Sequence, residues 1–440
     1  MNIIKLLSLI AFLPTLFPIY KVFKRKDINA WDLMLLFIGL YFCFIPFFSS
    51  EITSVVTDSN VIWKIFFLYS GIAILLLLID LYCSYSPLKN KKLLMNITFS
   101  IRGLVPYLTN TKYIRILSCI VILGAIVIII PNETVFFEKE SKGYLESSII
   151  MLYGRIYSFF FILNILLFFN TKKNISDNII LFLFFTVSFF LGRRYFFEYV
   201  MFFLITYYSL YIKTIRLRSI VKSVIIITLI ITFLFPFYNV MRQSIYEYNF
   251  SDKNNIINST TDLVKYSFKN YDKLIDEAKN STNTRSYELY HSLYCYILKN
   301  PAPLEGSAFS AGVLTVIPSI LGPNQKKISS ESMLESHSNI FRDMADSLLL
   351  LCYGDWHMWG ICACILILIC FMLLVEILHL IFRKIFYNKA VTIVYIGVLF
   401  LSCISIEQSL EEGIAILFHS TLALFLLVFL ALKKNVLRKY

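Results

Sequence analysis

The chain has 440 residues, of which 58% are hydrophobic and only 16% are charged, and its formal net charge is +13. Soluble domains carry about 25% charged residues, and many apolar runs here approach or exceed the roughly 20 residues with which a helix crosses a bilayer. The composition excludes a soluble globular protein and indicates a polytopic membrane protein. The nine cysteines lie mostly inside apolar runs, which excludes a disulfide framework.

Eleven apolar segments predict an all-α bundle of about eleven transmembrane helices. In chain order they are residues 1–20, Trp31–Ser49, Val61–Tyr82, Ile114–Pro131, Ile149–Phe169, Ile179–Leu191, Tyr195–Ile212, Ile220–Tyr238, Trp356–Phe382, Ala390–Ile406 and Gly413–Leu432. The first segment has the length of a signal peptide, but Pro14 and Pro18 interrupt it and no small-x-small cleavage site follows, so we expect a retained helix. The prediction divides the chain into helices one to eight over residues 1–238, a large external loop over 239–355, and the last three helices over 356–440.

Lysine and arginine residues alternate between strongly and weakly basic loops along the chain. The segments 21–30, 83–115, 170–178, 213–222, 383–389 and 433–440 hold 23 of them, whereas the short segments 50–60, 132–148, 192–194 and 407–412 hold four. Cytoplasmic loops carry the excess of basic residues in membrane proteins. The alternation predicts an external N-terminus and a cytoplasmic C-terminus, and it explains the positive charge without a nucleic-acid partner.

The sequence Gly192-Arg193-Arg194 separates two apolar runs. A single helix over residues 179–212 would be about 51 Å long, whereas the hydrocarbon core is about 30 Å thick. We therefore expect two crossings joined by a tight external turn, in which Gly192 tolerates a positive φ.

Four arginines are predicted to lie near the outer membrane interface. Arg193 and Arg194 are in the turn, Arg155 is about one and a half turns inside the fifth helix, and Arg242 lies just outside the eighth. A guanidinium is costly inside a bilayer, and its two-pronged donors match a phosphate group. A lipid-linked diphosphate is the partner that we expect, and contact with lipid headgroups or with Glu198 is the alternative.

The external loop over 239–355 holds 11 Lys and Arg and 13 Asp and Glu, so it is nearly neutral. Within it, Ser286–Leu298 has Tyr and Leu at helical spacing and predicts an amphipathic helix. The apolar run Met344–Tyr353 is too short to cross a bilayer, and we expect it to lie re-entrant against the membrane.

Three residues are candidates for a general base. His291 and His337 lie in the external loop, where each is a possible base or hydrogen-bond donor or simply a solvated side chain. Asp355 precedes the ninth helix, where it is either an N-cap or a base. His357 is expected to anchor the interface, and His379 to pair with Glu376 on its own helix. Neither a metal-spaced His/Cys cluster nor a phosphate-cradling loop is present in the sequence, so we expect no cofactor and no metal.

In this order of features the chain resembles the O-antigen polymerases, the oligosaccharide repeat-unit polymerases of Gram-negative inner membranes. The resemblance covers the architecture of about eleven or twelve helices with one large periplasmic loop late in the chain. It also covers three local patterns, which are Gly192-Arg193-Arg194-Tyr195, Gly306-Ser307 followed by an apolar stretch ending in Ile317-Pro318, and Tyr353-Gly354-Asp355-Trp356 leading to Gly360.

The resemblance implies a multi-pass inner-membrane glycosyltransferase whose substrates are undecaprenyl-diphosphate-linked oligosaccharides. A sugar hydroxyl of one repeat unit would attack the anomeric carbon of the growing chain, and undecaprenyl diphosphate would leave. The arginines would stabilise the diphosphate, and His337, Asp355 or His291 would take the hydroxyl proton. Tyr287, Tyr290 and Tyr294 are the expected sugar contacts, and a chain-length regulator is a possible partner.

Besides a structural or scaffold role, against which the cost of Arg193 and Arg194 between apolar runs argues, two other functions stay open. An O-antigen ligase, which transfers finished polysaccharide to lipid A core, has a similar architecture. A flippase or transporter for lipid-linked oligosaccharides is the second alternative, although such proteins show internal repeats, of which this sequence has no sign.

Overall fold

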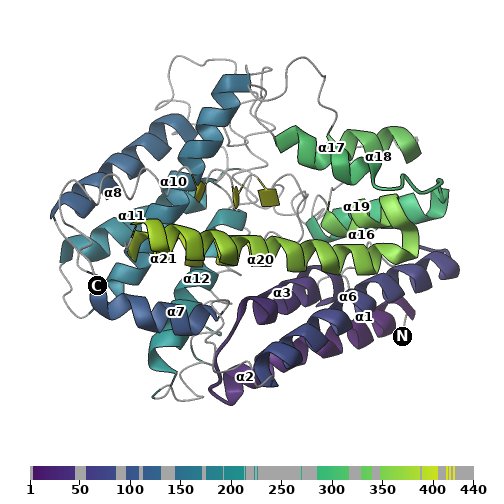
Figure 1. Cartoon of the computed structure of the whole chain (residues 1–440), viewed down its shortest axis with the longest axis horizontal. Coiled ribbons are helices and arrows are strands. Elements are labelled where there is room, and N and C mark those ends of the chain that lie inside the picture. Colours follow the sequence, from purple (N-terminus) through teal and green to yellow (C-terminus); the bar gives the residue numbers. More distant parts are fainter. Residues whose placement is uncertain are drawn as a thin grey trace. The chain divides into compact units, whose positions relative to one another are not determined.

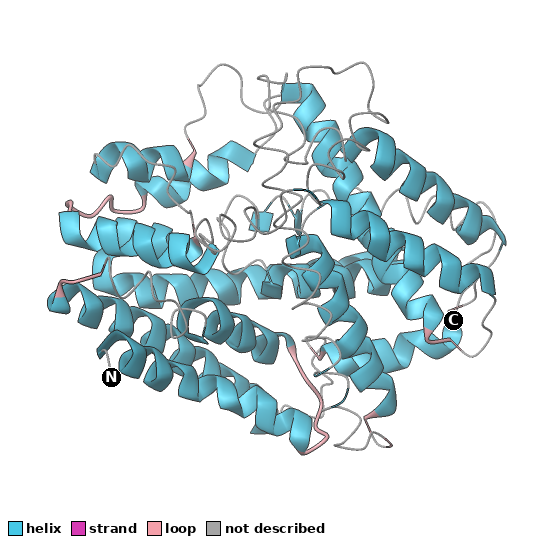
Figure 2. Ribbon diagram, turned by 180° about the vertical axis from the view of Figure 1, so that it is seen from behind, coloured by secondary structure: helices cyan, strands magenta, loops and turns pink. Residues whose placement is uncertain are grey.

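A computed structural model provides the structure of the chain (Figures 1 and 2). It describes residues 3–44, 56–85, 96–108, 112–129, 144–170, 175–191, 193–212, 285–316, 329–338, 347–386 and 389–404, with a few single positions between 214 and 421. The described residues form helices, with no strand among them, so the all-α prediction is confirmed for this part of the chain. The chain divides into two compact units, one of residues 1–104 and 283–440 and one of residues 105–282.

The helices of the first unit are α1 (Ile3–Phe12), η1 (Leu13–Thr15), α2 (Leu16–Phe23), α3 (Ala30–Ile38), η2 (Gly39–Phe44), α6 (Ser59–Tyr85), α7 (Ile97–Leu104), α16 (Arg285–Lys299), α17 (Ser307–Val316), α18 (Ser330–Ser338), α19 (Leu348–Trp356), η6 (His357–Trp359), α20 (Gly360–Phe386) and α21 (Lys389–Ile404). The helices of the second unit are η4 (Val105–Tyr107), α8 (Lys112–Gly124), η5 (Ala125–Ile129), α10 (Tyr144–Phe168), α11 (Ile175–Leu191) and α12 (Arg193–Tyr211).

Among the described residues, three helical stretches are long and apolar enough to cross a membrane. They are Ile3–Phe23, Ser59–Cys83 and Leu348–Phe386. These stretches indicate a membrane protein, as the composition predicts. The count of eleven crossings stays a prediction, because most of the expected eighth and eleventh helices and much of the external loop lie outside the described residues.

The helix α6 has one buried face and one exposed apolar face. Ile65, Leu68 and Leu76 are fully buried against neighbouring helices. The opposite face is exposed yet apolar, and it carries Trp63, Phe67, Ile74 and Leu78. In water such a face would be polar, so this stripe is suited to contact with acyl chains.

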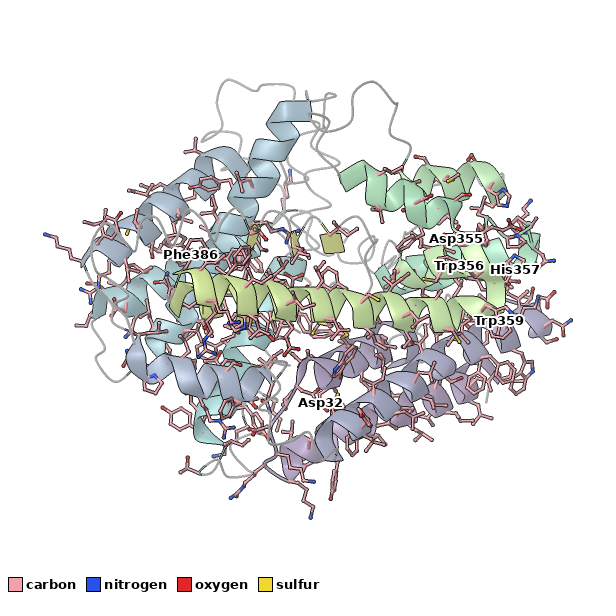
Figure 3. The ribbon with its side chains drawn as sticks, in the orientation of Figure 1. Asp32, Asp355, Trp356, His357, Trp359 and Phe386 are labelled. Carbon is pink, nitrogen blue, oxygen red and sulfur yellow. The ribbon has the colours of Figure 1, made fainter. Side chains whose placement is uncertain are left out.

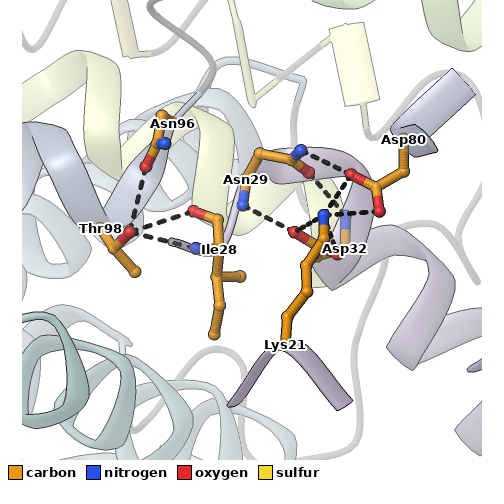
Figure 4. A network of polar contacts seen from close by, with 7 residues as sticks. All are labelled: Lys21, Ile28, Asn29, Asp32, Asp80, Asn96 and Thr98. Atoms are coloured by element: carbon orange, nitrogen blue, oxygen red, sulfur yellow. Dashed lines mark hydrogen bonds and ion pairs between the residues drawn. The ribbon is translucent and has the colours of Figure 1, made fainter. Parts of the chain in front are cut away.

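A buried ionic network joins α2, α3 and α6 at one end of these helices (Figure 4). The Nζ atom of Lys21 lies 2.9 Å from the Asp32 carboxylate and 2.6 Å from that of Asp80, and the three side chains are 4%, 0% and 0% exposed. Asn29 donates from its side chain to Asp80 (2.6 Å), and with Asp32 it forms a capping box at the start of α3. In the sequence pattern Lys21 is only a loop charge, and this network is not predictable from it.

At the opposite end of the same helices, α1, η2 and the start of α6 meet α16. Ile4, Phe42, Ile62 and Tyr290 line one small cavity there. The chain from α1 to α2 therefore runs parallel to α6, and α3 with η2 runs antiparallel to both.

The helix α20 packs on α6 and α21, and α21 packs on α3 and α7. His379 of α20 stacks on Tyr395 of α21 with ring centroids 4.0 Å apart. Neither of its ring nitrogens has a hydrogen-bond partner among the described residues. The expected pair of His379 with Glu376 is therefore wrong, because the ring turns towards α21 rather than along its own helix.

The second unit is held together by an aromatic core with buried polar contacts. The hydroxyl of Tyr157 on α10 donates to the carbonyl of Phe184 on α11 (2.7 Å), and that of Tyr199 on α12 donates to Ser158 (2.7 Å). Phe189 of α11 packs edge-on against Phe196 of α12. The sequence predicts two crossings over 179–212; the structure has two helices there, α11 and α12, and their crossing of a membrane stays a prediction.

Ion pairs join segments that the charge pattern assigns to the same side of the membrane. Arg102 pairs with Asp27 in the first unit, and Arg115 pairs with Asp177 in the second (2.7 Å). Each pair links two of the predicted cytoplasmic loops, as the alternation of basic loops requires. Which face is cytoplasmic stays a prediction.

Candidate functional site

The four helices α16 to α19 belong to the segment predicted to be the external loop; α19 packs on α20, and α16, α17 and α18 each contact α19. In Figure 1 they lie together near one end of the long α20, and Figure 3 places Asp355, Trp356 and His357 at that end and Phe386 at the other. Of the candidate bases predicted in the loop, Asp355 and His337 both contact the same short segment here, residues 300–306.

The helices α19 and α20 form an antiparallel pair. His357 adopts φ 49° and interrupts the helical stretch, and α19 then packs back along α20. Gly360 permits the close approach, because a Cβ atom there would lie 2.6 Å from the carbonyl carbon of Cys352 and 2.9 Å from the nitrogen of Tyr353. Every residue of Leu348–Asp355 is buried. The expectation that Met344–Tyr353 lies re-entrant against the membrane stays a prediction; its described helical part, residues 348–353, packs against α20.

The carboxylate of Asp355 caps the helix α17. It is fully buried, and it accepts hydrogen bonds from the backbone N–H groups of Ala308 (3.0 Å) and Phe309 (2.8 Å). An anion at a helix N-terminus satisfies free N–H groups and interacts favourably with the helix dipole. Of the two roles considered for Asp355, capping is the one that the geometry displays, although the capped helix is α17 and not its own.

A segment of irregular backbone, Asn300–Gly306, lies between α16 and α17 and is held from two sides. On one side, Leu304 N–H donates to the carbonyl of Gly354 (3.1 Å), and Glu305 N–H donates to that of Asp355 (3.0 Å). On the other, two histidines reach consecutive carbonyls. Nε2 of His337 lies 2.7 Å from the oxygen of Ala302, and Nε2 of His357 lies 2.9 Å from that of Pro301.

These contacts fix the tautomer of both imidazoles. A carbonyl oxygen can only accept, so each Nε2 must carry the proton. In the neutral ring the lone pair is then on Nδ1. His337 is partly exposed at the end of α18, whereas His357 stacks on Tyr353 with ring centroids 5.4 Å apart. His337 therefore has the features of a general base that a backbone carbonyl orients.

Tyr296 of α16 packs edge-on against Tyr353 of α19. Its hydroxyl has no hydrogen-bond partner among the described residues, and a Cβ atom on Gly354 would lie 3.2 Å from it. Burial, followed by the nearby charge of Asp355, raises the pKa of Tyr296, so the phenol stays protonated at neutral pH.

The other residues expected in the loop lie elsewhere. His291 contacts Cys295 one turn further along α16, with Nε2 and Sγ 3.5 Å apart. Tyr290 is buried against Tyr69, and the hydroxyl of Tyr294 accepts from the backbone of Asp58 (3.3 Å). Both tyrosines thus pack α16 onto α6, and neither presents a ring to solvent. Tyr287 is also in α16, but its side chain is not among those described.

The arginines expected near the outer interface belong to the second unit. Arg193 and Arg194 begin α12, their side chains are not described, and Arg242 lies outside the described residues. Arg155 is on α10, which begins at Tyr144 and not at Ile149. It therefore lies about three turns from the helix start, and its position near the outer interface stays a prediction.

Two residues of the site were missed from the sequence. His357 was expected to be an interface anchor, yet its ring binds Pro301. Glu305 received no role, although the turn-forming sequence Pro301-Ala302-Pro303 and the following Gly306 mark an irregular segment there.

No three His, Cys, Asp or Glu side chains come close enough to hold a metal ion in the part of the chain that the structure describes. Comparisons with known protein families, with curated proteins and with solved structures find no match.

Proposed function

We propose that this chain is a membrane glycosyltransferase that joins lipid-linked oligosaccharide repeat units into a surface polysaccharide. The proposal depends on one observation, which is that two of the sequence patterns that resemble those of the O-antigen polymerases contact each other in the structure. The Gly306-Ser307 pattern begins α17, and the Tyr353–Gly360 pattern spans the turn between α19 and α20. Asp355 of the second pattern caps the helix that begins in the first.

The geometry of α6 supports an external position for this site. Ile62 lies near Tyr290 of α16, and Asp80 of the same helix lies in the network with Lys21. Their separation of 18 residues corresponds to about 27 Å along the helix, close to the roughly 30 Å of a hydrocarbon core. Since Lys21 begins a predicted cytoplasmic loop, the external loop would stand at the opposite face.

In the proposed reaction, a sugar hydroxyl of the acceptor attacks the anomeric carbon of the donor chain. The new C–O bond forms while the bond to the diphosphate oxygen breaks, and undecaprenyl diphosphate leaves with the bonding electron pair. Nδ1 of His337 would take the hydroxyl proton, with the ring held by Ala302. The arginines Arg193, Arg194, Arg242 and Arg155 are proposed to stabilise charge on the leaving diphosphate.

The test is deletion of the gene in its host, followed by an electrophoretic lipopolysaccharide profile. Deletion should leave core carrying a single repeat unit. Wild-type protein should restore the long chains, whereas His337→Ala and the double variant Arg193→Ala/Arg194→Ala should not. Ser336→Ala, which changes an exposed neighbour on α18, is the matched control and should restore them.

Other outcomes would support the alternatives. Core without repeat units, with long chains retained on the lipid carrier, would indicate a ligase. Core without any external intermediate would indicate a flippase. An unchanged profile would remove the chain from this pathway.

A further inference from the structure

The backbone of Glu305 adopts a conformation that its side chain disfavours. Its φ is +52°, in the left-handed region, which glycine and asparagine occupy far more readily than glutamate. The residue directly precedes Gly306, which also has a positive φ of 90°.

The other positive φ values of non-glycine residues, within the described chain, have a local reason. Arg25 and Asn300 follow the ends of α2 and α16, where a left-handed residue commonly terminates a helix. His357 forms the turn between α19 and α20. Glu305 instead lies with Gly306 in the turn Leu304–Ser307, which is closed by the N–H of Ser307 donating to the carbonyl of Leu304 (3.0 Å). A turn with positive φ at both central residues is usually built from Gly, Asn or Asp, so glutamate is an unfavourable choice for this position. Strained residues of this kind cluster at functional sites.

The surroundings of Glu305 offer an aromatic surface. The N–H of Glu305 donates to the carbonyl of Asp355, and the residues that follow these two, Gly306 and Trp356, also lie close together. A Cβ atom on Gly306 would lie 3.5 Å from the ring of Trp356, and Phe309 lies 6.2 Å from the same ring. The side chain of Glu305 is exposed and that of Trp356 is partly exposed.

We propose that Glu305 and Trp356 form a sugar-binding subsite of the candidate site, and this inference rests on the proposed function. A carboxylate accepts hydrogen bonds from sugar hydroxyls, and a partly exposed indole offers an apolar face to the C–H groups of a sugar ring. The subsite would hold a sugar of the lipid-linked repeat unit beside the segment that His337 and His357 clamp. The backbone strain at position 305 is then the cost of presenting a carboxylate where glycine would fold better.

The inference makes glycine at position 305 an informative replacement. Glu305→Gly relieves the strain and removes the carboxylate, so it should raise the melting temperature in detergent by about 1–2 °C. It should nevertheless lower the yield of polymerised chains in the complemented deletion strain by roughly tenfold or more, as expected for lost hydrogen bonds to a charged group.

Asn300→Gly is the matched control, because it relieves a left-handed residue in the same segment without removing a charge. It should keep the long chains. Glu305→Gln keeps the side-chain length and should also lower the yield at unchanged melting temperature. Trp356→Phe retains an aromatic face and should lose less polymer than Trp356→Leu.

The outcomes separate this inference from the proposed function. If deletion leaves a single repeat unit but Glu305→Gly and Glu305→Gln polymerise as wild type does, the subsite is wrong and the function stands. A lower melting temperature of Glu305→Gly would contradict the strain and overturn the inference as well. If deletion leaves the lipopolysaccharide profile unchanged, the proposed function and the sugar subsite are both wrong.

Discussion

Replacing Lys21 with methionine removes the ammonium group that lies between the carboxylates of Asp32 and Asp80 while keeping the length of the side chain. In the wild type, Nζ is within 2.9 Å of both carboxylates, whose side chains are fully buried. The variant leaves two negative groups next to each other without that counter-charge. We expect it to be much less stable than the wild type.

The expected loss follows from the burial of the network. Removing one partner of a buried ion pair costs about 3–5 kcal/mol, because the remaining charge is left uncompensated. With an unfolding entropy of about 2.1 cal/mol/K per residue, this corresponds to a fall in melting temperature of about 3–5 °C for a chain of this length. Asp80→Asn leaves one ammonium and one carboxylate, so it should cost less than Lys21→Met.

The assay is thermal unfolding of the purified protein in detergent, followed by tryptophan fluorescence. Trp31 is buried beside Asp32 and reports on this region. Lys24→Met is the control, since Lys24 is exposed on the same segment and its loss changes the net charge equally. A Lys21→Met variant as stable as Lys24→Met, or more stable than Asp80→Asn, would refute the reasoning.

Three further substitutions test the site and the cores. Gly360→Ala should push α19 away from α20 and lower the free energy of unfolding by about 1–3 kcal/mol. The control is Gly103→Ala, whose Cβ atom would meet nothing within 4 Å, and it should be neutral or stabilising. Thermal unfolding compares the two variants. Asp355→Ala should lower the free energy of unfolding by about 1–3 kcal/mol, because it leaves buried N–H groups of α17 unpaired. Asp355→Asn keeps an oxygen acceptor, so it should be less destabilising and should retain polymerisation in the complementation assay. Tyr157→Phe should cost about 0.5–1.5 kcal/mol by removing the hydroxyl that binds the carbonyl of Phe184, again measured by thermal unfolding.

Each of these expectations has an outcome that contradicts it. Equal stability of the two glycine variants would speak against the close approach of α19 to α20. Complete loss of polymer in a stably folded Asp355→Asn variant would make Asp355 a base and not only a cap. An unchanged melting temperature of Tyr157→Phe would mean that its hydroxyl bond contributes nothing.

The helices could be predicted from the sequence because each needs only a local signal. A helix that crosses lipid must satisfy its backbone internally and must be apolar over about 20 residues. For this reason the expected third helix, Val61–Tyr82, is found as α6, and α11 and α12 are found as two separate helices. The same local signal predicts that the run Met344–Tyr353 is too short to cross.

The partners of the polar side chains could not be predicted in this way. The sequence offered Asp355 as a cap or a base, but the helix that it caps lies nearly fifty residues earlier, and only the turn at His357 brings the two together. The spacing of Tyr290 and Tyr294 places them on one face of a helix, but it does not say whether that face binds sugar or packs on another helix. In the structure α16 contacts α6, and both tyrosines are buried there.

The sequence by itself determined that the protein is helical, apolar and basic on alternate loops, because these properties depend on composition and on neighbours along the chain. The tertiary structure decided that Lys21 meets Asp80, 59 residues away, and that His337 meets the carbonyl of Ala302. It also revealed the left-handed conformation of Glu305. Contacts and strain of this kind depend on how helices pack, and packing is a property of the whole fold that no local stretch of sequence contains.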